Sequence, residues 1–183
     1  MADTVRTLAE LLVLLADNTS GAISEQDMRD VVVSLSPAHG GMYISTAIET
    51  SIAGTSTDGS NAVKALGTTT AFASLQDMDM PASNRLRYTG AANRLFTIQV
   101  AISTIAAANS KVFGWYLAKN GTVITESLIT RKQGTGADVG ALALLWQIEL
   151  AQNDYIEVFL EDQTDTTNAT MNQMIMVMEG QNT

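Results

Sequence analysis

Any chemistry in this sequence would have to be carried by carboxylates, because the 183-residue chain has no cysteine and one histidine, His39. A thiol nucleophile, a disulfide framework and a two-histidine metal site are therefore excluded, and a serine nucleophile would have only His39 as its base. Two carboxylates suffice for glycoside hydrolysis, and the candidates are Glu126, Glu149, Glu157 and Glu161. Glu157 and Glu161 share one face of an expected strand, which favours a solvated or interface edge. We predict no catalytic residues and no enzymatic activity.

Two acidic clusters, at residues 77–79 and 161–165, offer the hard oxygen ligands that calcium prefers. Neither has the spacing and central glycine of an EF-hand loop, so we expect acidic surface loops and no metal, with an ion on an oligomer axis as the lesser alternative. The glycine-rich stretch 134–140 is one residue longer than the dinucleotide fingerprint and precedes a strand, not a helix. We interpret it as a flexible connection and predict no cofactor.

The charge balance excludes further classes of partner. Acidic residues outnumber basic ones 19 to 10, which gives a net charge of −9 and argues against a nucleic-acid or anionic-membrane surface. The longest apolar run, residues 11–16, falls well short of the ~20 residues of a membrane helix and lacks the basic start of a signal peptide. Only 16% of the residues are charged and 46% are apolar, so we expect apolar surface to be hidden between subunits.

The first 41 residues show helical periodicity. Apolar residues recur at helical spacing over residues 4–16, and so short a helix needs a partner to be stable. A second helix is predicted over residues 25–35, because Ser24 can cap the amide of Asp27 as in a capping box. Pro37 ends it, since the residue before a proline avoids the helical region.

Beyond residue 41 the apolar pattern has mostly period two, which predicts strands. The strongest patterns cover residues 95–102, 144–150, 156–160 and a hairpin of 112–119 with 122–130. Asn120-Gly121 between the hairpin strands is the preferred type I′ turn pair. Weaker strands are expected at 42–46, 49–52, 63–66 and 85–88, and a last one at 171–178, with Pro37 and Pro81 outside the strands. Many short strands with regular turns predict a sandwich or barrel.

The last strand suggests oligomerisation, because Met174, Met176 and Met178 lie on one face and Ile175 and Val177 on the other. A strand that is apolar on both faces is buried on both, either against a neighbouring subunit or, equally, under a loop of the same chain. The strand at 112–119 has the same property. We predict a symmetric oligomer, a trimer, whose adaptable methionine face packs on itself; the predicted interface residues are Phe113, Trp115, Leu117, Met174, Met176 and Met178.

Two stretches resemble a known class of protein. Residues 15–35, from Leu15-Ala16-Asp17 to Val33-Ser34-Leu35, resemble a short module that precedes a β-rich domain in structural proteins of tailed bacteriophages. The order of residues 87–90, the strand to residue 102, the hairpin around residues 120–121 and the strand at 154–158 is similar to phage virion domains with a tumour-necrosis-factor-like, complement-like jelly roll.

The resemblance implies a mainly β, antiparallel jelly-roll sandwich at residues 42–183, homotrimeric and preceded by a helical anchor or stem at residues 1–41. Only residues 36–41 separate the two parts, which favours a compact decoration protein over a long tail fibre. The implied function is a non-enzymatic capsid decoration or head-fibre trimer on the virion surface, made in the host cytoplasm. It would bind the major capsid protein or another virion protein through the anchor residues Leu8, Leu11, Leu12, Leu15, Ile23 and Met28. The alternative is a tail-tip or tail-fibre receptor-binding protein that contacts the host surface, for example a glycan.

Overall fold

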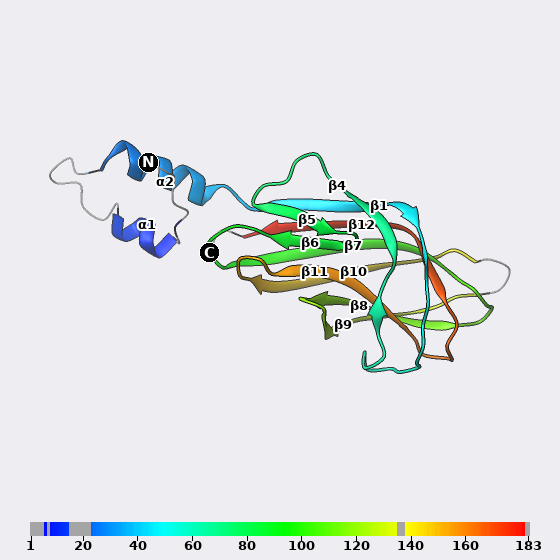
Figure 1. Cartoon of the computed structure of the whole chain (residues 1–183). Helices are drawn as coiled ribbons and strands as arrows, with labels where there is room; N and C mark the ends of the chain where they lie inside the picture. The colour runs from blue at the N-terminus through cyan, green and yellow to red at the C-terminus, as the bar shows by residue number, and fades with distance from the viewer. Residues whose placement is uncertain (1–5, 7, 15–22, 135–137, 182–183) are drawn as a thin grey trace.

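The computed structural model describes residues 6, 8–14, 23–134 and 138–181 (Figure 1). Two helices, α1 (Leu8–Leu14) and α2 (Glu25–Leu35), precede two antiparallel sheets. The first sheet has the order β10 (Gly140–Leu150), β7 (Arg94–Ala106), β12 (Ala169–Gly180), β1 (His39–Ala47) and β4 (Gly67–Ala71), with β2 (Glu49–Thr50) paired to β12. The second sheet has the order β5 (Met78–Ala82), β6 (Arg85–Tyr88), β11 (Tyr155–Asp162), β8 (Val112–Lys119) and β9 (Thr122–Lys132), with β3 (Val63–Lys64) paired to β11.

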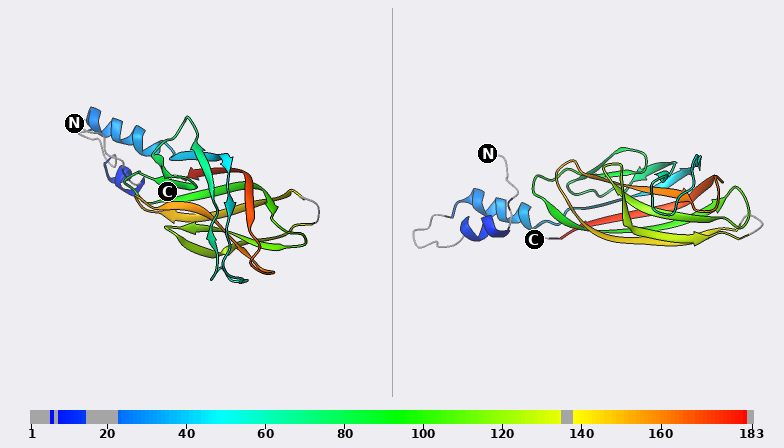
Figure 2. Two further views of the ribbon diagram at one scale, coloured as in Figure 1. Left: turned by 45° about the vertical axis from the view of Figure 1, so that its right-hand side comes forward. Right: turned by 90° about the horizontal axis from the view of Figure 1, so that it is seen from below.

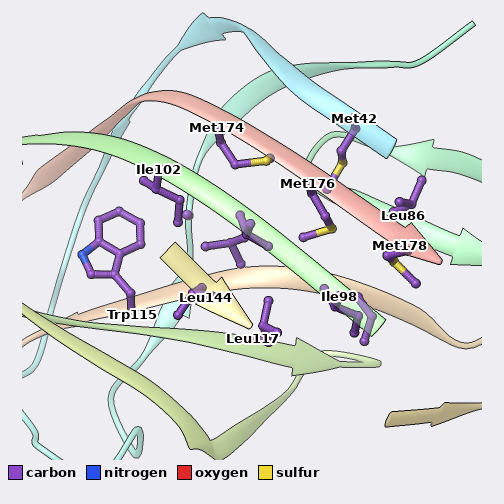
Figure 3. Close-up of a cluster of buried hydrophobic side chains, with 14 of the residues drawn as sticks. Met42, Leu86, Ile98, Ile102, Trp115, Leu117, Leu144, Met174, Met176 and Met178 are labelled. Atoms are coloured by element: carbon purple, nitrogen blue, oxygen red, sulfur yellow. The ribbon is translucent and has the colours of Figure 1, made fainter. Parts of the chain in front are cut away.

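The two sheets pack face to face as a jelly-roll sandwich, which confirms the predicted fold class. The core between them is built from alternate residues of each strand, as Figure 3 shows for Met42, Ile98, Leu117 and Leu144. At one end of the sandwich, where β1 begins and β12 ends, the two helices project away from the strands (Figure 2). Among the described residues, none of the helices is both long and apolar enough to cross a membrane.

Local chemistry accounts for the elements that the sequence predicts best. Helix α2 has the expected bounds, and its capping box is complete: Asp27 N donates to Ser24 Oγ at 3.2 Å, and Ser24 N donates to Asp27 Oδ2 at 2.7 Å. In the β8–β9 hairpin, Asn120 and Gly121 have φ of 53° and 78°, as a type I′ turn requires. Each strand predicted with period two is present. Strands β1, β7, β9, β10, β11 and β12 extend beyond the expected bounds, and β2 and β3 are shorter than expected.

The structure corrects the expected start of the sandwich, the number of strands and the position of Pro81. Strand β1 begins at His39, so the sandwich starts three residues before the expected boundary at 42. Strands β4 and β5 were not expected, and β5 contains Pro81. The proline is tolerated because β5 is the edge strand of the second sheet, where a residue without an N–H group need not break a ladder.

The six predicted trimer-interface side chains, Phe113, Trp115, Leu117, Met174, Met176 and Met178, instead form part of the intramolecular core. All are at most 1% exposed in the single chain. The alternation along β8 and β12 correctly separates the two faces of each strand. The six residues, however, lie on the faces that point toward the opposite sheet, not toward another subunit. They are therefore corrected from interface to core.

The opposite faces of β8 and β12 differ from each other. Tyr116 of β8 is fully buried, because the connection between β2 and β3 folds over it and brings Gly59 against its ring. The alternative interpretation, a strand covered by a loop of the same chain, therefore holds for β8. On β12, Ile175 is 52% exposed, so nothing in the described chain covers it.

Candidate interaction surfaces

The outer face of the first sheet, which we call the outer sheet face, is an uncharged and largely apolar surface. The register aligns Tyr43, Ile175, Ala101 and Ala143 in one row across β1, β12, β7 and β10. Side chains of directly opposite residues lie on the same side of an antiparallel sheet and contact one another. Four strands from distant parts of the sequence therefore contribute to one apolar row.

The neighbouring rows carry no charge either. On the side nearer the helices the row is Gly41, Val177, Gln99 and Leu145, and on the other side Gln173, Ser103 and Ala141 are aligned. Leu145 is 66% exposed and Tyr43 is 40% exposed. Uncharged rows with large exposed apolar side chains are typical of a surface that another protein covers.

The outer sheet face is hollowed where its residues are small. A hollow of about 530 Å³ is lined by Tyr43, Phe72, Ala101 and Ile175 among others, and one of about 470 Å³ by Ala143, Leu145 and Val177 among others. Phe72 lies directly over Gly41, where a Cβ atom would come within 2.4 Å of its ring, and its ring stacks at 6.3 Å from that of Tyr43. The face thus offers both raised aromatic groups and recesses.

The helical segment is a second surface with exposed apolar groups. Asp30, 1% exposed, holds the segment together: its Oδ2 accepts from Arg6 Nε at 2.9 Å and its Oδ1 from Gln26 Nε2 at 2.8 Å. The backbone N–H of Arg6 also donates to Ser34 Oγ at 2.8 Å. The bonds of Arg6 join the chain just before α1 to α2. The exposed apolar side chains are Leu12, Val13, Met28, Val32 and Leu35.

The structure separates the predicted anchor residues. Leu12 and Met28 are exposed as an anchor requires, and Ile23 is half-buried. Leu11 is 4% exposed, so it packs within the chain and is corrected from anchor to internal contact. The side chain of Leu8 and the whole of Leu15 lie outside what the structure describes. Val32 and Leu35 are also exposed on α2. They follow Met28 by four and seven residues, a helical spacing that the sequence alone shows.

Arg94 joins the helical segment to the sandwich. It is 5% exposed at the start of β7, and its guanidinium donates to Ser34 O at 3.0 Å and to Ser36 O at 3.2 Å. These carbonyls belong to the end of α2, which lacks helical partners and carries a partial negative charge. The bond pair therefore fixes the direction in which α2 leaves the sandwich.

The candidate catalytic glutamates of β11 are neither solvated nor available. Glu157, 1% exposed, accepts from Arg85 Nε at 3.0 Å and pairs with Lys64 Nζ at 2.8 Å, while Arg85 also lies over the Tyr155 ring at 4.0 Å. The expectation of a solvated or interface edge is therefore wrong for Glu157, because β3 and β6 supply cations that cover it.

Glu161 is fully buried, and its oxygens accept from four donors of the same chain. They are Tyr116 Oη at 2.5 Å, Gly59 N at 3.1 Å, Gln163 Nε2 at 3.3 Å and the hydroxyl of Ser56. Burial, followed by the hydrogen bond to Glu161, raises the pKa of Tyr116 above its ordinary value. With these four hydrogen bonds, the Glu161 carboxylate holds the β2–β3 connection against β8, and neither of its oxygens is open to a substrate.

The two acidic clusters are also structural. Asp162 is fully buried and accepts from the backbone N–H groups of Thr164, Asp165 and Thr167; burial raises its pKa. The hydrogen bond from Lys111 lowers the pKa of Asp165. Asp79 belongs to β5 and not to a loop, and a hydrogen bond from Arg87 lowers its pKa. Among the described residues, no group of three or more histidine or acidic side chains could hold a metal ion.

The remaining candidate side chains stand apart from these clusters. Glu126 and Glu149 are exposed on β9 and β10. His39 is exposed at the start of β1, with its Nδ1 3.1 Å from Pro37 O. The stretch 134–140 joins β9 to β10, as expected of a connection, and its residues 135–137 lie outside the described part of the chain.

Comparison with known proteins identifies the class of fold. No protein-family model matches the sequence, and no curated protein is detected as its relative. Among solved structures, murine APRIL is similar over 77% of this chain and 98% of its own, with 9% identity and a TM-score of 0.51. Eiger TNF from S. frugiperda is similar over 80% of this chain and 94% of its own, with 8% identity and a TM-score of 0.50. The PRD1 vertex protein P5 shows a lower TM-score of 0.44, at 11% identity over 80% of this chain and 97% of its own. The chain thus has the tumour-necrosis-factor-like jelly-roll fold.

Proposed function

We propose that the chain is a non-enzymatic structural protein of a bacteriophage virion, a capsid decoration or head-fibre protein. Three copies associate through the outer sheet face, and the exposed apolar residues of α1 and α2 attach the trimer to the major capsid protein or another virion protein. The jelly rolls are then displayed on the capsid surface.

The observation that carries the proposal is the outer sheet face itself. Its three uncharged rows, with Leu145 and Ile175 more than half exposed, need a partner in water. A second copy of the chain supplies one of matching character, and a closed symmetric assembly covers the face in every copy. Three copies are proposed because the sequence order of residues 87–158 resembles the trimeric jelly rolls of phage virions.

The attachment role follows from the second apolar surface. Residues 1–41 carry two arginines against six acidic residues, so attachment rests on apolar packing and hydrogen bonds more than on charge. Arg94 holds α2 in a fixed direction, which presents Met28, Val32 and Leu35 without a flexible linker. The resemblance of residues 15–35 to the phage module supports a virion as the location.

The test is a binding assay with purified particles of the source phage. A variant lacking residues 1–35 is expected to remain a folded trimer and to stop decorating the particles. Its matched control is the full chain with Val139→Ser, which changes an exposed apolar residue on the connection between β9 and β10 and should bind normally. Capsid binding by the truncated protein would refute the anchor role, and density at the tail tip in electron micrographs would support the receptor-binding alternative instead.

A further inference from the structure

One end of the sandwich core is polar, near the point where the chain passes from β9 to β10. The buried side-chain atoms there have no hydrogen-bond partner among the described residues; they are Thr104 Oγ1, Trp115 Nε1, Arg131 Nε, and Gln133 Oε1 and Nε2. Gln133 is 1% exposed, and Thr104 and Trp115 are fully buried. Native proteins satisfy nearly all buried polar atoms. Several unpaired ones in one region therefore point to a bound ligand.

The register brings three of these side chains to one place, around Gly140. A Cβ atom on Gly140 would lie 3.0 Å from Arg131 Nε and 3.4 Å from Gln133 Nε2. Thr104 is the direct partner of Gly140 in the β7–β10 ladder, so its side chain lies on the same side of the sheet. The φ of Gly140 is not positive, so the backbone does not require a glycine here. A side chain at this position would crowd Arg131 and Gln133, and the glycine therefore lets both side chains approach the backbone of β10.

Trp115 borders the same region. Arg131 pairs with Phe113 in the β8–β9 ladder, and Trp115 lies two residues further along β8 on the same face. Figure 3 shows Trp115 beside Ile102, the residue two positions before Thr104, with the indole nitrogen turned away from Leu117 and Leu144. The indole N–H group is therefore directed out of the apolar cluster.

Arg131 differs from the other arginines of the described chain. Arg6, Arg29, Arg85 and Arg87 pair with carboxylates, and Arg94 donates to two carbonyls. Arg131 has neither kind of acceptor among the described residues, and its Nε atom is buried. Three of the unpaired atoms can only donate a hydrogen bond: Arg131 Nε, Trp115 Nε1 and Gln133 Nε2. One of them, Gln133 Oε1, can only accept. The surplus of donors, together with one positive charge, selects an anion over a cation.

We propose that Thr104, Arg131, Gln133 and Gly140, bordered by Trp115, form an internal binding site for a small monovalent anion of the size of chloride. The ligand is small because the unpaired atoms are closed to solvent, so a carboxylate on another protein has no access to them. The site joins β7, β8 and the β9–β10 connection, and an anion bound there stabilises that end of the sandwich.

The test compares the full-length protein in sodium bromide and in sodium gluconate at equal ionic strength, since gluconate is too large to enter. Binding to the folded state alone raises the melting temperature; for a chain of this size, bromide at tenfold excess over its Kd should raise it by roughly 4 °C. A crystal grown in bromide should show an anomalous peak within hydrogen-bond distance of Arg131 Nε and Gln133 Nε2.

The variants separate this site from a general salt effect. Arg131→Gln and Gly140→Ala should remove the bromide-dependent rise, whereas Lys132→Gln, which removes the adjacent exposed charge, should keep it. Equal melting temperatures of the wild-type protein in the two salts, or anomalous peaks confined to the molecular surface, would overturn the proposal. If Arg131→Gln fails to fold, the bromide crystal of the wild-type protein decides the question.

Discussion

At the scale of single residues, buried charged side chains join segments of the chain that are distant in sequence. Arg94 has the largest expected effect, because it lies in the sandwich and hydrogen-bonds two carbonyl groups at the end of α2. Asp30 and Glu161 play the same part for α1 and for the β2–β3 connection. Each of them engages a segment distant in sequence.

Replacing Arg94 by methionine should loosen the helical segment from the sandwich. The variant loses two charge-assisted hydrogen bonds, each worth about 1.5–3 kcal/mol when intact, and we expect a fall of about 2–4 kcal/mol in the free energy of unfolding. Urea denaturation followed by circular dichroism measures it. The matched control is Arg29→Met, which removes an exposed ion pair with Glu25 and should change the free energy of unfolding by less than about 0.5 kcal/mol. Equal losses in both variants would contradict the role of Arg94 in holding α2 to the sandwich.

The capping box of α2 predicts a dependence on pH. Hydrogen bonds from the backbone and side chain of Ser24 hold the pKa of Asp27 below its ordinary value of 3.8. Because folding favours the ionised form, the contribution of Asp27 to stability is present above pH 3.8 and is lost as the pH falls through the lowered pKa. An NMR titration of the Asp27 carboxyl carbon should give a midpoint below 3.8 that rises in Ser24→Ala. A midpoint unchanged by that substitution would show that the box does not form in solution.

Glu157 tests the distinction between a structural and a catalytic carboxylate. Glu157→Gln leaves Lys64 and Arg85 without their carboxylate; removing one partner of a fully buried pair costs about 3–5 kcal/mol. Both cations are about one third exposed, so we expect a smaller loss, roughly 1–3 kcal/mol. Any polysaccharide-degrading activity of source particles should be unaffected by the substitution, and a loss of such activity without a loss of stability would reverse our interpretation.

At the scale of elements, the sequence predicts what depends on neighbouring residues and misses what depends on distant ones. Ser24 with Asp27, and Asn120 with Gly121, determine a helix start and a hairpin by local geometry, so both are predictable. Strand β4 lacks large apolar residues, so it shows no alternation, and β5 contains a proline that only its edge position permits. The burial of Glu157 depends on cations from β3 and β6, and no pattern within β11 indicates them.

The surface assignments fail for a related reason. Alternation along β12 shows two apolar faces, but it does not say which face meets the opposite sheet. Ile175, which remains exposed, and Val177, which is half-buried, form the other half of the same pattern. Recognising the outer sheet face required the register that aligns β1, β12, β7 and β10.

The two faces of β12 should respond differently to truncation. Met176→Ala removes a side chain from the packed core and should cost about 2–5 kcal/mol of folding free energy. Ile175→Ala, on the outer sheet face, should leave the fold of each subunit intact and weaken association instead. Chemical denaturation and sedimentation of both variants measure the two effects, and a larger loss of subunit folding stability in Ile175→Ala would contradict the assignment.

At the scale of the whole molecule, one sandwich connects two apolar surfaces, the outer sheet face and the helical segment. The low charge content of the chain, 16%, is explained by the uncharged rows of the outer sheet face as well as by the core. The helices project from one end of the sandwich (Figure 2), so a trimer built on the sheet faces presents three helical segments. This arrangement supports the proposed association of copies through the outer sheet face.

The most direct test of this account is the mass of the protein in solution, measured by sedimentation equilibrium at micromolar concentration. The wild-type chain should have the mass of three copies, and Ile175→Glu should have the mass of one copy with the circular dichroism spectrum of the folded protein. Leu66→Glu, which places the same charge on an exposed apolar residue between β3 and β4, should remain a trimer. A wild-type protein that is a stable monomer, or an Ile175→Glu variant that remains a trimer, would contradict the central claim.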